Sequence, residues 1–134
     1  MKRPILLIND NPDLLCRLSA CLDQAGFDVS VAPDGAAGMA VLYQHAPCWV
    51  LLDLSMPVMD GYEFLNALRT VPFPPRVFVV TDDDCSEARQ RSQHLGAEQF
   101  FTEEQALHPQ FAPSLREALG LPPQDRLPPV AAAA

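Results

Sequence analysis

The chain has 134 residues and a formal net charge of −8 at pH 7, and hydrophobic residues make up 49% of it. This length predicts one domain, and the hydrophobic content excludes an intrinsically disordered chain. The acidic balance, with Lys2 as the only lysine, argues against a nucleic-acid partner, because binding to a phosphate backbone needs a basic patch.

Five short apolar runs alternate with segments in which apolar residues recur at helical spacing. In chain order, the pattern predicts a strand at residues 5–8, a helix stopped by Gly26, a strand at 27–32, a helix from about 34 to 46, a strand at 48–53, a helix at 61–70, a strand at 76–81, a helix from about 84 to Gly96, a strand at 98–102 and a helix from about 110 to 119. This alternation predicts an α/β protein whose parallel five-stranded sheet is covered by helices on both faces.

Two helix boundaries carry specific signals. Asp84 and Glu87 can form a capping box at the start of the polar fourth helix. Pro109 and Pro113 interrupt the apolar stripe of the last helix, so we expect a separate short turn before it.

The end of the chain differs in composition from the rest. Residues 121–134 are rich in proline and alanine and contain too little apolar surface for a core, so they predict a tail or linker after a domain at residues 1–120. No output domain is expected after residue 120, which leaves a stand-alone domain or a fragment of a longer protein.

The cysteines and the apolar runs bear on the compartment. The four cysteines, Cys16, Cys21, Cys48 and Cys85, form no CxxC pair and have no histidine at zinc-ligand spacing, so we expect free thiols. The first apolar run is too short for a signal peptide, and no run could cross a membrane. We therefore expect a cytoplasmic protein without a membrane partner.

Polar side chains stand where the predicted strands end. Asn9 and Asp10 follow the first strand, Asp53 ends the third, Thr81 ends the fourth and Glu103 follows the fifth. Because reactive groups gather at the carboxyl ends of parallel strands, we expect these side chains at one edge of the sheet. An ionised aspartate at the end of a buried strand is costly, so Asp53 either reaches water there or is placed for chemistry.

The segment DLSMPVMDG at residues 53–61, with Asn-Asp after the first strand, VVT in the fourth and LGAEQFF in the fifth, resembles the receiver domain of two-component response regulators. The resemblance covers about residues 3–120. It implies a flavodoxin-like, doubly wound fold and a non-enzymatic role in phosphorelay signal transduction. The implied partners are a histidine kinase or phosphotransfer protein and a downstream protein target, and the implied cofactor is Mg²⁺.

The resemblance also assigns roles at the edge of the sheet. Asp53 would be the phosphoacceptor, attacking as a carboxylate nucleophile. Asp10, Asp53 and the backbone carbonyl of Ser55 would hold Mg²⁺, with Asn9 as a weak or water-mediated ligand.

Two further residues stand at the family's switch positions. Thr81 would hydrogen-bond the phosphoryl group and report phosphorylation by moving inward, and Phe100 would be the mobile aromatic side chain. A simpler structural role stays open for each: Thr81 as a hydroxyl that caps a strand end, and Phe100 as a core residue of the fifth strand.

The sequence departs from the family at two positions, so we expect a degenerate, atypical site. Asn9 replaces the first of two acids, which weakens Mg²⁺ binding, and Glu103 replaces the lysine that pairs with the aspartyl phosphate. At about 5 Å and an effective dielectric constant near 20, each unit-charge interaction is worth about 3 kcal/mol. Glu103 could itself ligate a metal ion, and Asp82 adds a carboxylate beside the site.

Two other functions remain open. The first is a pseudo-receiver that acts as a docking or dimerisation module without phosphorylation; in either case a homodimer through the face of the fourth and fifth strands is a candidate assembly. The second is a haloacid-dehalogenase-like phosphatase, which is disfavoured because that family needs an acid at the position of Ser55.

Overall fold

The computed structural model describes residues 3–45, 47, 49–82 and 85–121. The elements are β1 (Arg3–Ile8), α1 (Pro12–Gln24), β2 (Phe27–Ala32), α2 (Gly35–His45), β3 (Trp49–Leu52), α3 (Gly61–Ala67), a short 3₁₀ turn (Leu68–Thr70), β4 (Arg76–Thr81), α4 (Ser86–His94), β5 (Gln99–Thr102), α5 (Glu103–Leu107) and α6 (Phe111–Ala118). The strands form one parallel sheet in the order β2-β1-β3-β4-β5, which confirms the predicted flavodoxin-like fold.

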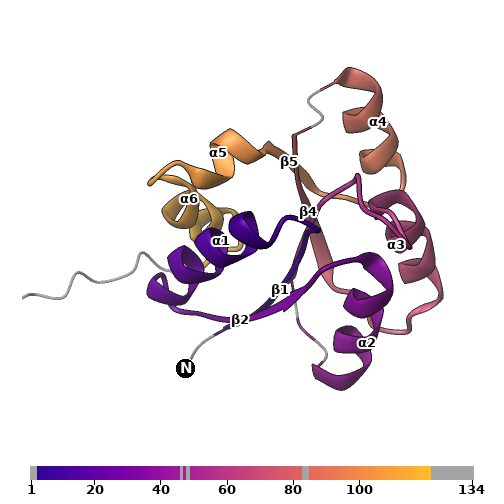
Figure 1. Cartoon of the computed structure of the whole chain (residues 1–134), viewed down its shortest axis with the longest axis horizontal. Helices are drawn as coiled ribbons and strands as arrows, with labels where there is room; N and C mark the ends of the chain where they lie inside the picture. The colour runs from indigo at the N-terminus through magenta and orange to yellow at the C-terminus, as the bar shows by residue number, and fades with distance from the viewer. Residues whose placement is uncertain (1–2, 46, 48, 83–84, 122–134) are drawn as a thin grey trace, which may run out of the picture.

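Helices cover both faces of the sheet. Figure 1 shows α1, α5 and α6 on one face and α2, α3 and α4 on the other. Along β1, Ile5 and Leu7 join the core under α1 and α6, whereas Leu6 and Ile8 join the core under α2 and α3. Because both sides of the central strands are buried, these strands are continuous apolar runs in the sequence.

The register brings the carboxyl ends of the strands to one level. Ile8 lies opposite Leu52, and Leu52 lies opposite Val79. The chain leaves β1 for β2 on one side and β3 lies on the other, so the strand order reverses at β1. Such a reversal opens a crevice at the carboxyl edge, where α/β proteins bind ligands.

The loop between β3 and α3 is fixed by backbone contacts. The Gly61 amide donates to the Leu54 carbonyl at 3.0 Å, and the Gly35 amide donates to the Met59 carbonyl at 3.1 Å. Asp60 caps α3 in a capping box with Glu63. The loop that follows the strand-end aspartate is therefore held to both α2 and α3.

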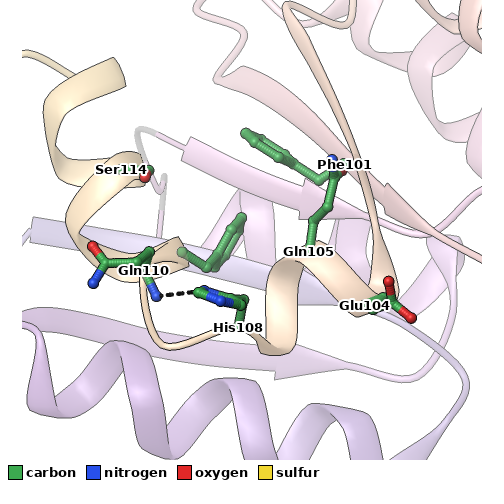
Figure 2. A pocket seen from close by; sticks show the side chains of 7 residues that line it. Phe101, Glu104, Gln105, His108, Gln110 and Ser114 are labelled. Atoms are coloured by element: carbon green, nitrogen blue, oxygen red, sulfur yellow. Dashed lines mark hydrogen bonds between the residues drawn. The ribbon is translucent and has the colours of Figure 1, made fainter.

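The last helix is divided as the two prolines predicted. α5 ends at Leu107 and α6 begins at Phe111, and between them the Gln110 amide donates to His108 Nδ1 at 3.1 Å (Figure 2). A hollow of about 310 Å³ lies between the two helices. A capping box of Thr102 and Gln105, which the sequence analysis did not anticipate, starts α5.

Several smaller expectations compare as follows. β3 and β5 are each shorter than expected, β3 ending at Leu52 and β5 starting at Gln99. The cap of α4 is Cys85, whose sulfur accepts from the Ala88 amide at 3.3 Å, and the expected cap Asp84 lies outside the described residues. Cys48 and nearly all of the expected tail at 121–134 also lie outside them.

Two findings bear on the compartment. Cys16, Cys21 and Cys85 are free thiols, as expected, and all three are exposed. Among the described residues, no helix is both long enough and apolar enough to span a bilayer.

Replacing Gly61 with alanine tests how tightly the loop after β3 is packed. A Cβ atom at Gly61 would overlap the Asp53 carbonyl oxygen and lie 2.7 Å from the Leu54 Cα, so backbone must move. We expect Gly61→Ala to lower the free energy of unfolding by about 1–3 kcal/mol in urea titrations followed by the single tryptophan, Trp49.

Gly38→Ala is the matched control. A Cβ atom there meets the end of a flexible side chain, Ile8 Cδ1 at 2.5 Å, and alanine favours a helix interior by about 0.5–1 kcal/mol over glycine. We expect a loss below about 1 kcal/mol. A larger loss for Gly38→Ala than for Gly61→Ala would contradict this description of the loop.

Candidate functional site

Asp53 is a buried carboxyl group at the carboxyl edge of the sheet. Its side chain lies directly after β3, and the residue is only 4% exposed. Its amide donates to the Ile8 carbonyl at 2.9 Å, which keeps it in register with β1 although β3 has ended. Its carboxyl Oδ1 accepts from the Ser55 amide at 3.4 Å, and the buried Thr81 at the end of β4 also hydrogen-bonds the carboxyl group.

Burial makes ionisation of Asp53 unfavourable. Desolvation raises the pKa of this carboxyl from its ordinary value of 3.8 to about 7. The hydrogen bonds from Ser55 and Thr81 lower the pKa, and the negative charges of Asp10 and Glu103 raise it further. The carboxylate form therefore needs a positive charge to compensate the cost of burial.

Three carboxyl groups converge at this edge. One oxygen from each of Asp53, Asp82 and Glu103 lies within 4.8 Å of the other two. Asp82 directly follows β4, and Glu103 is the first residue of α5. The predicted meeting of Asp53, Thr81 and Glu103 is therefore confirmed.

Asp10 contributes mainly through its charge. It is exposed and lies outside the group of three, among the residues that the structure describes. It is still close enough to raise the pKa values of Asp53 and Glu103, although less than other causes do. Its predicted role as a direct metal ligand stays a prediction.

Asn9 and Glu103 hydrogen-bond each other through their side chains. Asn9 is buried, at 4% exposed, and its Oδ1 accepts from the Asn11 amide at 2.8 Å. The side-chain amide group of Asn9 is therefore the part that donates to Glu103. Desolvation and then Asp82 raise the pKa of Glu103, the Asn9 hydrogen bond lowers it, and Asp10 raises it.

The start of α5 holds Glu103 in position. The Thr102 hydroxyl accepts from the Gln105 amide at 3.1 Å, and Gln105 Oε1 accepts from the Thr102 amide at 2.8 Å. Glu103 lies between the members of this reciprocal pair. The sequence analysis named Glu103 but missed this cap, whose signal was the spacing Thr-x-x-Gln.

Phe100 packs inside the molecule. It is 7% exposed, and the guanidinium carbon of Arg89 lies 4.5 Å from its ring centroid. The contact joins α4 to β5, beside the strand that carries Thr81. Phe100 is thus placed to sense movement of α4 relative to the sheet.

The donor atoms at the edge suit a hard divalent cation. Carboxylate oxygens are the ligands that Mg²⁺ and Ca²⁺ prefer. Ser55 is exposed beside Asp53, so its carbonyl remains a predicted additional ligand. Asn9 also stays a predicted weak ligand, although its carbonyl oxygen already accepts a hydrogen bond.

Comparison with known proteins identifies the family. The model of the response regulator receiver domain matches residues 5–108. The transcriptional regulatory protein PrrA of Mycobacterium tuberculosis is 30% identical over 96 residues, which cover 72% of this chain and 41% of PrrA. The transcription regulator BvgA of Bordetella pertussis is 30% identical over 109 residues, which cover 81% of this chain and 52% of BvgA. The chain thus spans about half the length of these relatives or less.

A solved structure shows the same fold. The chemotaxis protein CheY4 of Vibrio cholerae superposes with a TM-score of 0.79 at 24% identity, covering 90% of this chain and 98% of CheY4. The family match extends over most of the chain, and Asp53 is buried where the family has its phosphoacceptor. The chain belongs to the response regulator receiver domain family of two-component signalling systems.

Proposed function

We propose that Asp53 accepts a phosphoryl group from a histidine kinase or phosphotransfer protein and that this modification changes the surface offered to a downstream protein. The observation that carries this proposal is the buried Asp53 carboxyl, hydrogen-bonded to Thr81 at the crevice where the strand order reverses. A structural aspartate gains nothing from such burial, because desolvation opposes its charge.

The reaction needs Asp53 as a carboxylate. One of its oxygens forms a bond to phosphorus while the bond between phosphorus and the donor atom breaks, and the donor leaves with the bonding electrons. The Ser55 amide and Thr81 hold the carboxyl group in place. After transfer, the Thr81 hydroxyl would hydrogen-bond a phosphoryl oxygen.

The proposed cofactor is Mg²⁺, which supplies charge neutralisation at the transferring phosphoryl group. Asp10, Asp53 and the Ser55 carbonyl would hold it by position in the family, with Asn9 as a weak or water-mediated ligand. The acidic group of Asp53, Asp82 and Glu103 supports a cation at this edge, because its oxygens are hard donors.

Phosphorylation would reach the surface through β4, β5 and α4. Movement of Thr81 toward the phosphoryl group would vacate space beside Phe100, whose ring is held by Arg89 of α4. We propose that this path alters the face formed by α4 and β5. The same face is the proposed surface for the downstream target and for a homodimer.

The domain proposed for this function extends to about residue 120. Leu115 and Leu119 are buried in the core under α1 and α6, so residues up to this point are needed for folding. The family match at residues 5–108 supports a domain that occupies most of the chain.

Phosphorylation of Asp53 can be tested with small donors. With Mg²⁺ and acetyl phosphate, we expect the mass of the intact protein to rise by one phosphoryl group, and with beryllofluoride we expect NMR shifts at Thr81. Asp53→Asn should abolish both responses, and Asp28→Asn, which removes an exposed carboxyl of β2, should retain them. A wild-type protein that behaves like Asp53→Asn at millimolar donor would exclude the proposal and favour a docking module.

The raised pKa of Asp53 predicts how stability depends on pH in metal-free protein. The folded protein binds the proton more tightly than the unfolded chain, because the folded pKa is about 7 and the ordinary value is 3.8. This stabilisation is complete below about pH 4 and is lost as the pH rises to about 7.

Asparagine carries no titrating proton, so Asp53→Asn should gain stability relative to wild type across this window. The limit of the gain is about 4 kcal/mol at 1.36 kcal/mol per pKa unit, with little change above about pH 8. Urea unfolding in EDTA at several pH values measures it. A difference between the two proteins that does not vary with pH would refute the raised pKa.

A further inference from the structure

We infer that Glu103 is a ligand of the divalent cation at this site, together with Asp53 and Asp82, and that Asn9 positions Glu103 for that role. The inference rests on the proposed function only in taking Mg²⁺ as the cation. It concerns two positions at which the chain departs from its family, and it treats them as one coupled change.

The distances between the carboxyl groups fit one ion. Oxygen ligands of Mg²⁺ lie about 2.0–2.1 Å from the metal, so oxygens on opposite sides of the ion are about 4.2 Å apart. The oxygens of Asp53, Asp82 and Glu103 lie within 4.8 Å of one another before any ion draws them together. Small side-chain rotations of the exposed Asp82 and the half-buried Glu103 are enough to close this difference.

The cation must come from solution. The sequence has a single lysine, Lys2, ahead of β1, so no lysine follows β5 as the family pattern requires. Arg116 donates to the Ala25 carbonyl at 2.9 Å, and the guanidinium of Arg89 lies over Phe100. Three carboxyl groups so close together repel one another as anions, and a bound divalent ion removes that repulsion.

The orientation of Asn9 explains why its side chain is an amide. The Asn11 amide occupies Oδ1, so the NH₂ group of Asn9 points to the Glu103 carboxylate. An aspartate at this buried position would present a second anion to Glu103. The acid that the family carries after β1 is thus replaced by one at the start of α5, and the asparagine is the hydrogen-bond donor that this arrangement needs.

Mg²⁺ binding by calorimetry tests the ligand. We expect Glu103→Gln to weaken Mg²⁺ binding at least tenfold. Glu104→Gln makes the same change in charge on the next residue, which borders the separate hollow between α5 and α6 (Figure 2), and should change affinity less than twofold. Equal effects of the two substitutions, or no Mg²⁺ binding by the wild-type protein, would overturn the inference.

A double-mutant cycle tests the positioning role of Asn9. Asn9→Ala should weaken Mg²⁺ binding about tenfold in the wild-type protein, as loss of the partner of a ligand does. It should change affinity less than twofold in Glu103→Gln, because the ligand that it positions is already lost. A merely structural effect of Asn9 would appear equally in both backgrounds and would overturn the positioning role.

A measurement on the wild-type protein does not depend on any variant folding. Mn²⁺ at substoichiometric concentration should broaden the side-chain carboxyl ¹³C signals of Asp53, Asp82 and Glu103 most strongly. Strong broadening at Asp53 and Asp10 with sharp Glu103 and Asp82 signals would overturn the inference and assign the ion to the family's ordinary position.

The outcomes separate this inference from the proposed function. Acetyl phosphate labelling of Asp53 with unchanged Mg²⁺ affinity in Glu103→Gln would refute the inference alone. Mg²⁺ binding that depends on Glu103, without labelling of Asp53 by either donor, would refute the phosphoacceptor proposal alone.

Discussion

The cost of burying the Asp53 carboxyl group governs the arrangement of this domain. The doubly wound sheet places this residue at the reversal of strand order, where β1, β3 and β4 end at one level. Burial there raises its pKa to about 7, and the neighbouring hydrogen bonds from Ser55 and Thr81 offset only part of that effect. The site is therefore balanced between a neutral acid and an anion that requires a cation. That balance makes the carboxyl group responsive to metal and to phosphoryl transfer, which a structural aspartate on a surface loop would not be.

The contact between Asn9 and Glu103 shows how a family site can change sign at two positions and remain organised. Taken singly, each departure looks like a loss: a missing acid after β1 and a missing lysine after β5. In the structure they meet, because the Asn9 amide donates to the Glu103 carboxylate. The acidic group near Asp53 is thereby shifted toward β4 and β5, where Asp82 joins it. The electrostatic character of the hollow is more acidic than the family pattern, yet its polar groups are paired.

Most of the fold could be predicted from the sequence because its signals are local. Continuous apolar runs marked strands buried on both faces, and Pro109 marked the break between α5 and α6. The meeting of Asp53, Thr81 and Glu103 followed from the rule that parallel strands end at one edge. What escaped prediction depends on side-chain direction over long sequence separations. The Asn9 hydrogen bond to Glu103 joins residues from opposite ends of the domain, and no spacing in the sequence indicates which part of the amide faces the carboxylate. The cap of α4 by Cys85 was missed because a cysteine is a weak acceptor that seldom serves this purpose.

The central claim is that the Asp53 carboxyl group resists ionisation in the free domain and becomes an anion when a cation enters the acidic hollow. Carbon-13 NMR of the Asp53 side chain, followed through a pH titration with and without Mg²⁺, measures this directly. The account predicts a midpoint near pH 7 in metal-free protein and a clear decrease when Mg²⁺ is added. A midpoint near the ordinary 3.8 without metal, or one that Mg²⁺ leaves unchanged, would contradict it.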